Sequence, residues 1–575
     1  MSPSPLSHSR SHTRATYLAL ASAALLILTT ATASAQLRIV TYNTTGAPRS
    51  GMDIILKSIG EESRNGIAKP IDVLILQEQN KPASPGANAP STDTQAFVAL
   101  LNSIYNNSGI TYSMSNRTGS SSFSDDTTQT LIYRNQTVQL IADTAFGTVG
   151  GSVQPRQTLR YQLRPVGYSS TANFYVYNSH YKASPDSPNT DRRNIEAIAI
   201  RANSDALGQG AHAIYAGDHN FYYSDSREPA VATLTAAGNG QAVDPLNRVG
   251  NWSNNSSYAD IHTQSPCATN CSLVSGGVDD RFDFQWVTDE FRDGEGLSYI
   301  GPTTTNPTAT THSYHAFGNN GSTFNNDINS ASNTVTFPGV TSYTKSQILD
   351  ALWGASDHLP VVADYQVPAI MQALAGSLPS SIDLGSAANI SVTVSNIANV
   401  VAAIGADELD YSVTSSGSVA GSFLNQIDAA LGSANLHQLS LNTSTIGTKS
   451  GTISVVSTSQ GVENGTINIP VNFLVVLPGD YNGNGAVDTA DYVVWRRNSG
   501  LTGGATYGSG DGNRDGNVTS ADYDIWRANF GQTAAGFGAA LASAVPEPAA
   551  WMLAAMSICL AGPRRTRLKR WTLQS

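Results

Sequence analysis

Six short polar motifs, each ending or following an apolar run, contain the residues best suited to catalysis in this chain. They are Thr-Tyr-Asn43, Leu-Gln-Glu78, Asn-Ser-His180, Gly-Asp218-His-Asn220, Arg-Phe-Asp283 and Ser-Asp357-His358. Carboxylates, amides and imidazoles can hold a divalent cation and move protons during metal-assisted hydrolysis. A single Asp, Asn or His at a strand end is more often a cap or turn residue. The order of the six and their shared strand context favour one common site.

The apolar runs predict the elements that must position these motifs. They are residues 38–43, 71–78, 174–180, 213–218 and 282–287. All are short and rich in β-branched or aromatic side chains, which is typical of buried strands. Loops beyond such strand ends hold polar groups on a rigid support. Asp218 and Asn220 are two positions apart, so an extended chain would point both to one side and His219 to the other.

With these motifs in this order, residues 36–366 resemble the endonuclease/exonuclease/phosphatase superfamily, which has the deoxyribonuclease-I-like fold. The family pattern has an Asn after the first strand, a Glu ending the next, a mid-domain His, Gly-Asp-x-Asn, Arg-x-Asp and a terminal Ser-Asp-His, and the chain matches each part. His219 departs from it, because the family commonly has an aromatic or aliphatic residue there. The resemblance implies an α/β (α+β) fold in which two mixed β-sheets form a four-layer sandwich with outer helices.

The resemblance also implies roles for the matching residues. The implied ligands of a divalent cation are Asn43, Glu78 and Asp357. The implied catalytic residues are His180, Asp218, Asn220, Asp283 and His358. In these roles Asp218, held by Asn220, positions or deprotonates the attacking water, and His358, oriented by Asp283, acts with His180 on the transition state and the leaving group. Oxygen ligands without Cys favour Mg²⁺ or Mn²⁺ at such a site.

The predicted activity is therefore hydrolysis of a phosphoester. The sequence leaves open whether the substrate is a nucleic acid, a phospholipid, an inositol phosphate or another small phosphodiester. The alternative is a catalytically inactive surface protein that binds or assembles, since a phosphoesterase fold can be kept without activity. Retention of Glu78, Asp218 and His358 favours the enzyme.

The two ends of the chain predict export. Arg10 and Arg14 precede an apolar stretch at 17–28 and the sequence Ala-Ser-Ala35, so residues 1–35 are expected to be a secretory signal peptide. Residues 545–575 contain Val-Pro-Glu-Pro548, an apolar segment and a basic end, and resemble a PEP-CTERM sorting tail. That resemblance implies an exosortase-type processing enzyme and passage through the cell envelope. An uncleaved membrane anchor is the alternative for this tail.

The segment from 367 to 477 alternates polar and apolar residues, with Gly, Ser and Asn between the runs. This pattern predicts an antiparallel β-sandwich and resembles the immunoglobulin-like modules of exported bacterial proteins. Nothing in it specifies a ligand. We therefore expect a spacer that holds the catalytic region away from a surface.

Residues 478–531 contain an internal repeat with the spacing of calcium loops. Oxygen donors at loop positions 1, 3, 5, 7, 9 and 12, with Gly at position 6, form that pattern. The expected calcium ligands are Asp480, Asn482, Asn484, Ala486 (by its carbonyl), Asp488 and Asp491, and then Asp511, Asn513, Asp515, Asn517 (by its carbonyl), Thr519 and Asp522. The pair resembles a dockerin, which implies Ca²⁺, a cohesin partner and an association with polysaccharide breakdown. A calcium-stiffened stalk is the alternative, and residues 532–544 are expected to be a linker.

Composition limits the choice of partners. The chain has 575 residues and a formal net charge of −11, and no Lys/Arg-rich stripe is visible. This argues against tight nonspecific binding of duplex DNA without excluding nucleic acid as a substrate. Arg156, Arg160 and the run 191–193 are candidate phosphate contacts, but we expect them to be solvated or to cap helices. Cys267 and Cys271 are expected to form a small local disulfide in an oxidising compartment.

Overall fold

The computed structural model describes residues 36–86, 88–122, 127–302 and 311–534. Residues 37–365 contain a six-stranded sheet in the order β10-β11-β1-β2-β4-β3 and a five-stranded sheet in the order β5-β6-β7-β8-β9. The first sheet comprises β1 (Leu37–Asn43), β2 (Val73–Asn80), β3 (Tyr112–Met114), β4 (Thr127–Arg134), β10 (His315–Ala316) and β11 (Val361–Tyr365). The second comprises β5 (Val138–Phe146), β6 (Thr158–Pro165), β7 (Phe174–His180), β8 (His212–Asp218) and β9 (Asp283–Val287). The predicted mixed α/β class with several sheets is confirmed.

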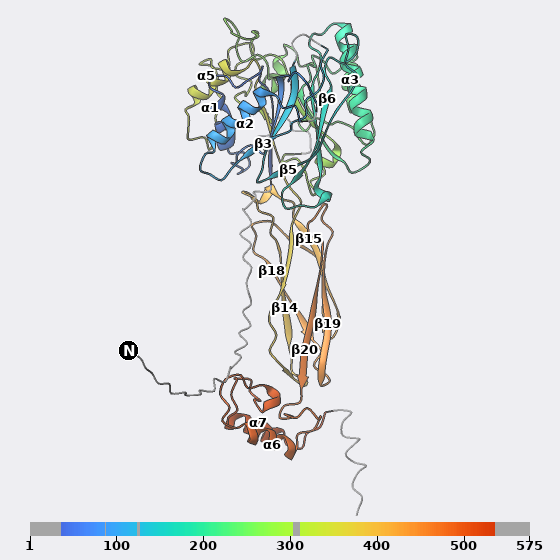
Figure 1. Ribbon diagram of the computed structural model, residues 1–575, viewed down its shortest axis with the longest axis vertical. Helices are drawn as coiled ribbons and strands as arrows, with labels where there is room; N and C mark the ends of the chain where they lie inside the picture. Colours follow the sequence, from blue (N-terminus) through green and yellow to red (C-terminus); the bar gives the residue numbers. More distant parts are fainter. Residues whose placement is uncertain (1–35, 87, 123–126, 303–310, 535–575) are drawn as a thin grey trace, which may run out of the picture.

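Helices lie on the outer sides of the two sheets (Figure 1). They are α1 (Met52–Glu61), α2 (Thr92–Ile104) and α5 (Lys345–Ala355) on the first sheet, and α3 (Ser187–Asp205) and α4 (Pro229–Thr235) beside the second. Ile75 and Ile214 belong to the core between the sheets. Leu56, Leu101 and Leu352 pack the first three helices onto their sheet. Strands such as β1 and β8 are therefore buried on both faces, which explains their continuous apolar runs.

Parallel pairing brings the polar strand ends together. Two strand pairs in this region run parallel, β1 with β2 and β7 with β8, so their carboxyl ends lie at the same sheet edges. The register sets Asn43 opposite Gln77 and His180 opposite Asp218. Strand β9 runs antiparallel to β8 and sets Asp283 opposite Asp218. Residues far apart in sequence are thus neighbours before any side-chain contact is considered.

Residues 371–476 form two further sheets, in the orders β12-β14-β18-β16 and β13-β20-β19-β15-β17. Their strands are β12 (Met371–Ala375), β13 (Ile382–Asp383), β14 (Asn389–Asn396), β15 (Leu409–Gly417), β16 (Val419–Ala420), β17 (Phe423–Asp428), β18 (Asn435–Leu441), β19 (Gly447–Ser457) and β20 (Thr466–Val476). Alternate side chains such as Val392, Val413 and Val455 are fully buried in a core shared by both sheets. The alternation seen in the sequence corresponds to these inward-facing positions. The immunoglobulin-like assignment stays a prediction.

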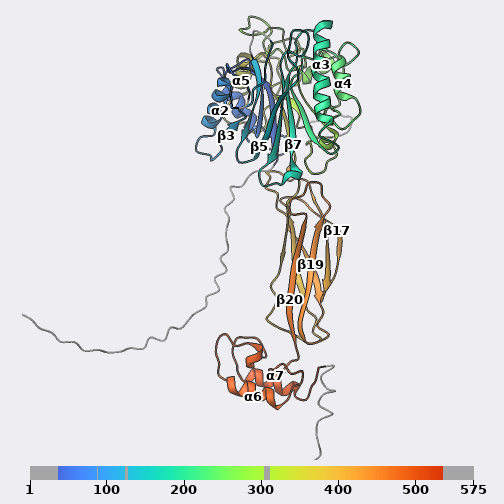
Figure 2. The same cartoon turned by 45° about the vertical axis from the view of Figure 1, so that its right-hand side comes forward.

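The described chain is elongated, with the two-sheet head at one end, the later sheets in the middle and a helix pair at the other end (Figures 1 and 2). The helix pair is α6 (Thr489–Asn498) and α7 (Ser520–Asn529). Tyr168 Oη donates to the carbonyl of Pro368 over 2.8 Å, which fastens the head to the middle segment. Arg514 Nε donates to Ser381 Oγ over 2.7 Å at the other junction.

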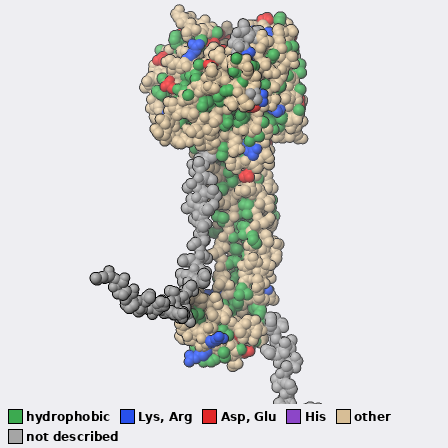
Figure 3. Space-filling view, viewed as in Figure 1, with side chains coloured by type: hydrophobic (Ala, Val, Ile, Leu, Met, Phe, Trp, Pro, Cys, Tyr) green, Lys and Arg blue, Asp and Glu red, His purple; other side chains and the backbone are tan. Residues whose placement is uncertain are grey.

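The two predicted terminal signals, 1–35 and 545–575, lie outside the described residues. Within the described part of the chain, every helix is too short or too polar to cross a membrane. On the face of the molecule in Figure 3, Lys and Arg side chains of the described residues are scattered and form no stripe.

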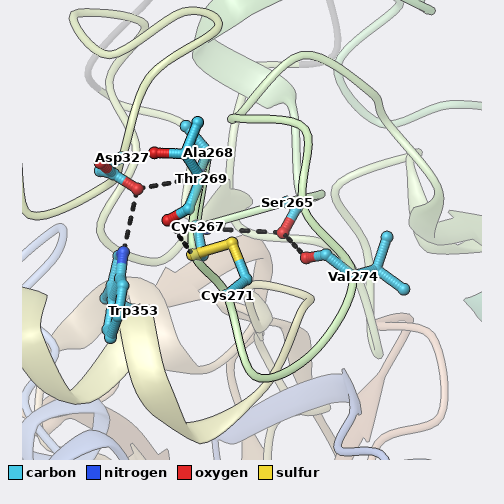
Figure 4. The surroundings of a disulfide bond; sticks show 8 residues. All are labelled: Ser265, Cys267, Ala268, Thr269, Cys271, Val274, Asp327 and Trp353. Atoms are coloured by element: carbon cyan, nitrogen blue, oxygen red, sulfur yellow. Dashed lines mark hydrogen bonds between the residues drawn. A yellow bond between two sulfur atoms is a disulfide. The ribbon is translucent and has the colours of Figure 1, made fainter.

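The predicted disulfide between Cys267 and Cys271 is present (Figure 4). It closes a small loop that leads toward β9. Next to it, Ser265 Oγ donates to the carbonyl of Val274 over 2.6 Å. Asp327 accepts from the backbone of Ala268 over 2.7 Å and from Trp353 Nε1 over 2.9 Å, so the loop is tied to α5.

Candidate active site

Two carboxylates and an imidazole meet where β2, β7 and β8 end. One ligand atom each of Glu78, His180 and Asp218 lies within 4.8 Å of the others. His180 Nε2 is 3.4 Å from Asp218 Oδ2 and 3.7 Å from Glu78 Oε1. His180 and Asp218 are buried, and Glu78 is half-buried. This group is the one set of at least three such ligands found among the described residues.

Asn43 joins the two sheets at this point. Its Nδ2 atom donates to Glu78 Oε1 over 3.1 Å and to Asp218 Oδ2 over 3.2 Å. Its Oδ1 atom accepts from the backbone of Thr45 over 3.3 Å. A residue at the end of β1 therefore holds both carboxylates in place.

A second pair of residues lies beside this group. His358 Nδ1 donates to Asp283 Oδ2 over 2.7 Å, and His358 Nε2 is 3.8 Å from Asp218 Oδ2. Both side chains of the pair are buried. Asp283 therefore fixes the ring of His358 with its Nε2 atom directed toward the carboxylates.

Asn220 differs from its expected arrangement. The extended conformation ends there, because Asn220 has a φ of 50°. Its backbone donates to Asp218 Oδ1 over 3.0 Å, while its side chain donates to the carbonyl of Tyr181 over 3.2 Å. Asn220 thus orients Asp218 through its backbone N–H. Its side-chain amide is bonded to Tyr181 and does not point to the same side as the Asp218 carboxylate. His219 is buried and stacks on Phe284, with ring centroids 5.3 Å apart.

Asp357 lies near the group but is not part of it. Its Oδ1 atom accepts from Thr45 Oγ1 over 3.1 Å. The neighbouring Ser356 Oγ donates to the carbonyl of Asn43 over 2.7 Å and so fixes this segment to β1. Of the three ligands expected from the sequence, the structure brings Glu78 into the group with Asn43 bonded to it. The other members of the group are His180 and Asp218, and a ligand role for Asp357 stays a prediction.

Two of the positive φ values belong to site residues. Glu78 has a φ of 58° and lies at the irregularity where β2 and β4 change register. A left-handed conformation is costly for a residue other than glycine and is often found at functional positions. Here it turns Glu78 out of the strand alternation and toward His180.

Burial sets the electrostatics of the group. Burial raises the pKa of Asp218 to about 7, with the nearby Asp283 and Glu78 adding to the effect, and it also raises the pKa of Glu78. Burial and the positive charge of Arg156 hold the pKa of His180 well below its usual range. Burial opposes protonation of His358, but Asp283 and Asp218 outweigh it and raise its pKa well above the ordinary value.

The donor set fits a divalent cation. Carboxylate oxygens are ligands that Mg²⁺ and Mn²⁺ prefer, and imidazole is a ligand for several transition metals. His180 Nδ1 is buried and has no hydrogen-bond partner among the described residues, so its ring is not committed to a protein carboxylate on that side. Glu78, Asp218 and His180, with Asn43 behind them, are the residues that would hold such an ion.

The sequence did not single out Gln264, which contacts His358. Its Nε2 atom is 2.7 Å from His358 Nε2. The backbone of Gln264 also forms isolated bridges with His358 and Asp280. Gln264 lies in a loop that contains no recognisable motif, 94 residues before His358 in the sequence. The sequence around Gln264 therefore gives no indication of this contact.

The expectation that Arg156, Arg192 and Arg193 are solvated is wrong. All three are buried, because backbone carbonyls and a carboxylate are available to them. Arg192 Nε donates to the carbonyl of Val153 over 2.7 Å, and Arg193 Nε donates to Glu228 over 2.9 Å. Arg156 Nη1 lies 3.5 Å from the carbonyl of His180, directly behind the site.

The two calcium-type loops share one conformation. Asp480 accepts from the backbone of Gly485 over 2.8 Å, and Asp511 accepts from that of Gly516 over 2.9 Å. Both glycines have a φ of +83°, which a side chain would disfavour. The last residue of each loop, Asp491 or Asp522, is buried. Calcium binding by these loops stays a prediction.

Comparisons with solved structures found matches at low sequence identity. No family model and no curated protein matches the sequence. An endonuclease/exonuclease/phosphatase from Bacteroides vulgatus is 14% identical with a TM-score of 0.30, over 58% of this chain and 100% of that one. One from Beutenbergia cavernae is 12% identical with a TM-score of 0.33, over 76% and 100%. A mannosyl-6-phosphatase from Bacteroides thetaiotaomicron is 14% identical with a TM-score of 0.31, over 57% and 99%.

Proposed function

We propose that this chain is a divalent-metal-dependent phosphoesterase that hydrolyses a phosphodiester by attack of water. The observation that carries the proposal is the meeting of Glu78, His180 and Asp218 within 4.8 Å of one another, beside the His358–Asp283 pair. Carboxylates that hold a cation and orient a water, next to imidazoles of different pKa, are suited to the cleavage of an anionic ester. The match of the sequence motifs to the endonuclease/exonuclease/phosphatase pattern supports the same function.

Each residue has a role that follows from its contacts. A divalent ion held by Glu78 and its neighbours would supply positive charge to the phosphoryl oxygens. Asp218 has its Oδ1 atom bonded to the backbone of Asn220, so Oδ2 faces the group and can orient a water and accept its proton. His358, fixed by Asp283, presents Nε2 to a phosphoryl oxygen. His180, kept neutral by burial, is a candidate ligand of the ion rather than a proton donor.

The remaining expectations are part of the proposal. The metal is Mg²⁺ or Mn²⁺, and the protein is exported and held in the cell envelope or at the cell surface by its terminal segments. The middle segment acts as a spacer, and the helix pair binds Ca²⁺ and docks to a cohesin or stiffens the stalk. The polar/apolar alternation supports the assignment of the middle segment, and the calcium-loop repeats support that of the helix pair.

The test uses the full chain and its His358→Ala variant. Both are incubated with bis-p-nitrophenyl phosphate, DNA, RNA, inositol phosphates and sphingomyelin, with Mg²⁺ or Mn²⁺ and with a chelator. We expect metal-dependent turnover that falls at least about 100-fold in the variant, the usual minimum contribution of a general acid or base. His437→Ala, which changes a histidine of the middle segment, is the control and is expected to keep full activity. Absence of turnover of any phosphoester by folded protein would favour the binding-protein alternative.

A further inference from the structure

A cavity of about 620 Å³ is lined by the segments that follow β7 and β8. Its walls include Pro185 and Asp191 from the segment after β7, and Tyr223 and Arg227 from the segment after β8. Pro185 follows His180 by five residues, and Tyr223 follows Asp218 by five. Five residues of extended chain span at most about 18 Å, so the cavity lies within reach of a substrate whose phosphate is at the site.

Tyr223 and Arg227 form a flat surface in this cavity, which we call the Tyr223–Arg227 platform. The guanidinium carbon of Arg227 lies 3.5 Å from the centre of the Tyr223 ring. Asp225 accepts from Arg227 Nε over 2.9 Å and from Nη2 over 2.7 Å. The ring and the carboxylate together fix the plane of the guanidinium group and neutralise its charge.

The same framework holds the cavity and the site. Arg193, which is fully buried, donates from Nη1 to the carbonyl of Lys182 over 2.6 Å and to that of Ser184 over 2.9 Å. Its Nε donates to Glu228 over 2.9 Å, which ties the segment after β7 to the segment after β8. The platform is therefore positioned relative to His180 and Asp218 by buried contacts.

We propose that the Tyr223–Arg227 platform stacks on an unpaired nucleobase of a single-stranded nucleic acid whose phosphodiester lies at Glu78, His180 and Asp218. The inference rests on the proposed phosphodiesterase function and names its substrate class. Stacking on aromatic and guanidinium planes is how proteins bind bases that are not paired. Asp191, in the cavity wall, offers acceptor oxygens for the amino groups of a base.

The charge of the molecule favours this mode of binding over recognition of a duplex. Duplex binding draws its affinity from Lys and Arg side chains on phosphates, whereas this chain is acidic and has no basic stripe in its sequence. A platform neutralised by Asp225 binds by stacking instead.

The experiment compares two single-stranded oligonucleotides of equal length, one with bases and one in which tetrahydrofuran spacers replace them. With the full chain and Mn²⁺, we expect kcat/KM to be about tenfold higher for the oligonucleotide with bases, within the range of one stacking contact. In Tyr223→Ala and Arg227→Lys this ratio is expected to fall to about one, because Ala removes the ring and Lys keeps the charge but not the guanidinium plane. In Tyr223→Phe the ratio should persist, because Phe keeps the ring. Arg527→Ala removes a similar Arg–Tyr pair on α7 and should leave the ratio unchanged.

Several results would overturn the inference. These are a wild-type ratio of one, an equal loss on both oligonucleotides in Tyr223→Ala, or equal cleavage of duplex and single strand. If no phosphoester is cleaved, the proposed function fails separately. Fluorescence anisotropy of the two labelled oligonucleotides with the full chain then decides the inference, because a base-binding platform still prefers the oligonucleotide with bases.

Discussion

Gln264 lies 2.7 Å from His358 Nε2, the atom that the proposed mechanism directs at a phosphoryl oxygen. Asp283 holds the other nitrogen of the same ring. The Gln264 side chain is half-buried, so it borders the site and touches the imidazole at its working end. Two contacts on opposite sides of one ring leave it little rotational freedom. We therefore regard Gln264 as a positioning residue for His358.

Replacing Gln264 by Ala is expected to lower kcat about tenfold, as loss of an orienting partner commonly does, with little change in KM. Gln264→Asn keeps the amide and should restore part of the loss. The measurement is steady-state kinetics on bis-p-nitrophenyl phosphate with Mn²⁺. Gln366→Ala, at the junction between head and middle segment, is the matched control. A rise in KM at constant kcat would contradict the positioning role, because it would mean that Gln264 binds the substrate in its ground state.

The sequence predicted the residues that lie at strand ends and missed those that act through tertiary contacts. Asn43, Glu78 and Asp218 come at the ends of apolar runs. Parallel pairing aligns such ends within each sheet, and the packing of the two sheets then brings the residues together. Gln264 reaches the site from a loop, and its contact with His358 depends on how distant segments pack. The proximity of His180 to Glu78 has the same origin, since it depends on side-chain directions that strand order does not fix.

At the scale of elements, helix α3 carries a buried acid behind the site. Burial raises the pKa of Glu196 to about 8, although Thr158, Arg156 and Arg192 lower it. Glu196 Oε1 accepts from Thr158 over 2.9 Å, and Oε2 has no partner among the described residues. Between pH 4.5 and about 8, Glu196 is therefore protonated in the folded protein and ionised in the unfolded chain. The packing of α3 on its sheet should depend on pH for this reason.

Because the folded pKa of Glu196 is the higher one, stability should fall as pH rises from the ordinary pKa of 4.5 to about 8. Glu196→Gln is neutral throughout, so its unfolding temperature should fall less between pH 5 and pH 9 than that of the wild type. The difference is expected to be several degrees, which calorimetry on the chelated protein would measure. Glu408→Gln, on an exposed position of the middle segment, should follow the wild type. Parallel curves for Glu196→Gln and wild type would contradict a buried, neutral Glu196.

At the scale of the whole molecule, the second calcium-type loop is part of a junction. Arg514, in this loop, donates to Ser381 Oγ over 2.7 Å and pairs with Asp383 of the middle segment. Tyr507, between the two loops, donates through its hydroxyl to the carbonyl of Leu477. Order in the loops therefore fixes the helix pair on the end of the elongated chain, far from the head (Figure 1).

Calcium is thus expected to stabilise this end of the molecule and leave catalysis in the head unchanged. Adding Ca²⁺ to the chelated full chain should stabilise the helix pair by about 2.7 kcal/mol for each loop at a hundredfold excess over Kd. This would be seen as a higher unfolding temperature and slower proteolysis after residue 477. Asp491→Ala with Asp522→Ala should abolish both effects, because each removes the buried carboxylate that closes a loop. Asp524→Ala, an exposed neighbour on α7, is the control. The same shift in the double variant, or an equal shift with Mg²⁺, would show that the loops are not selective calcium sites and that other contacts hold the junction.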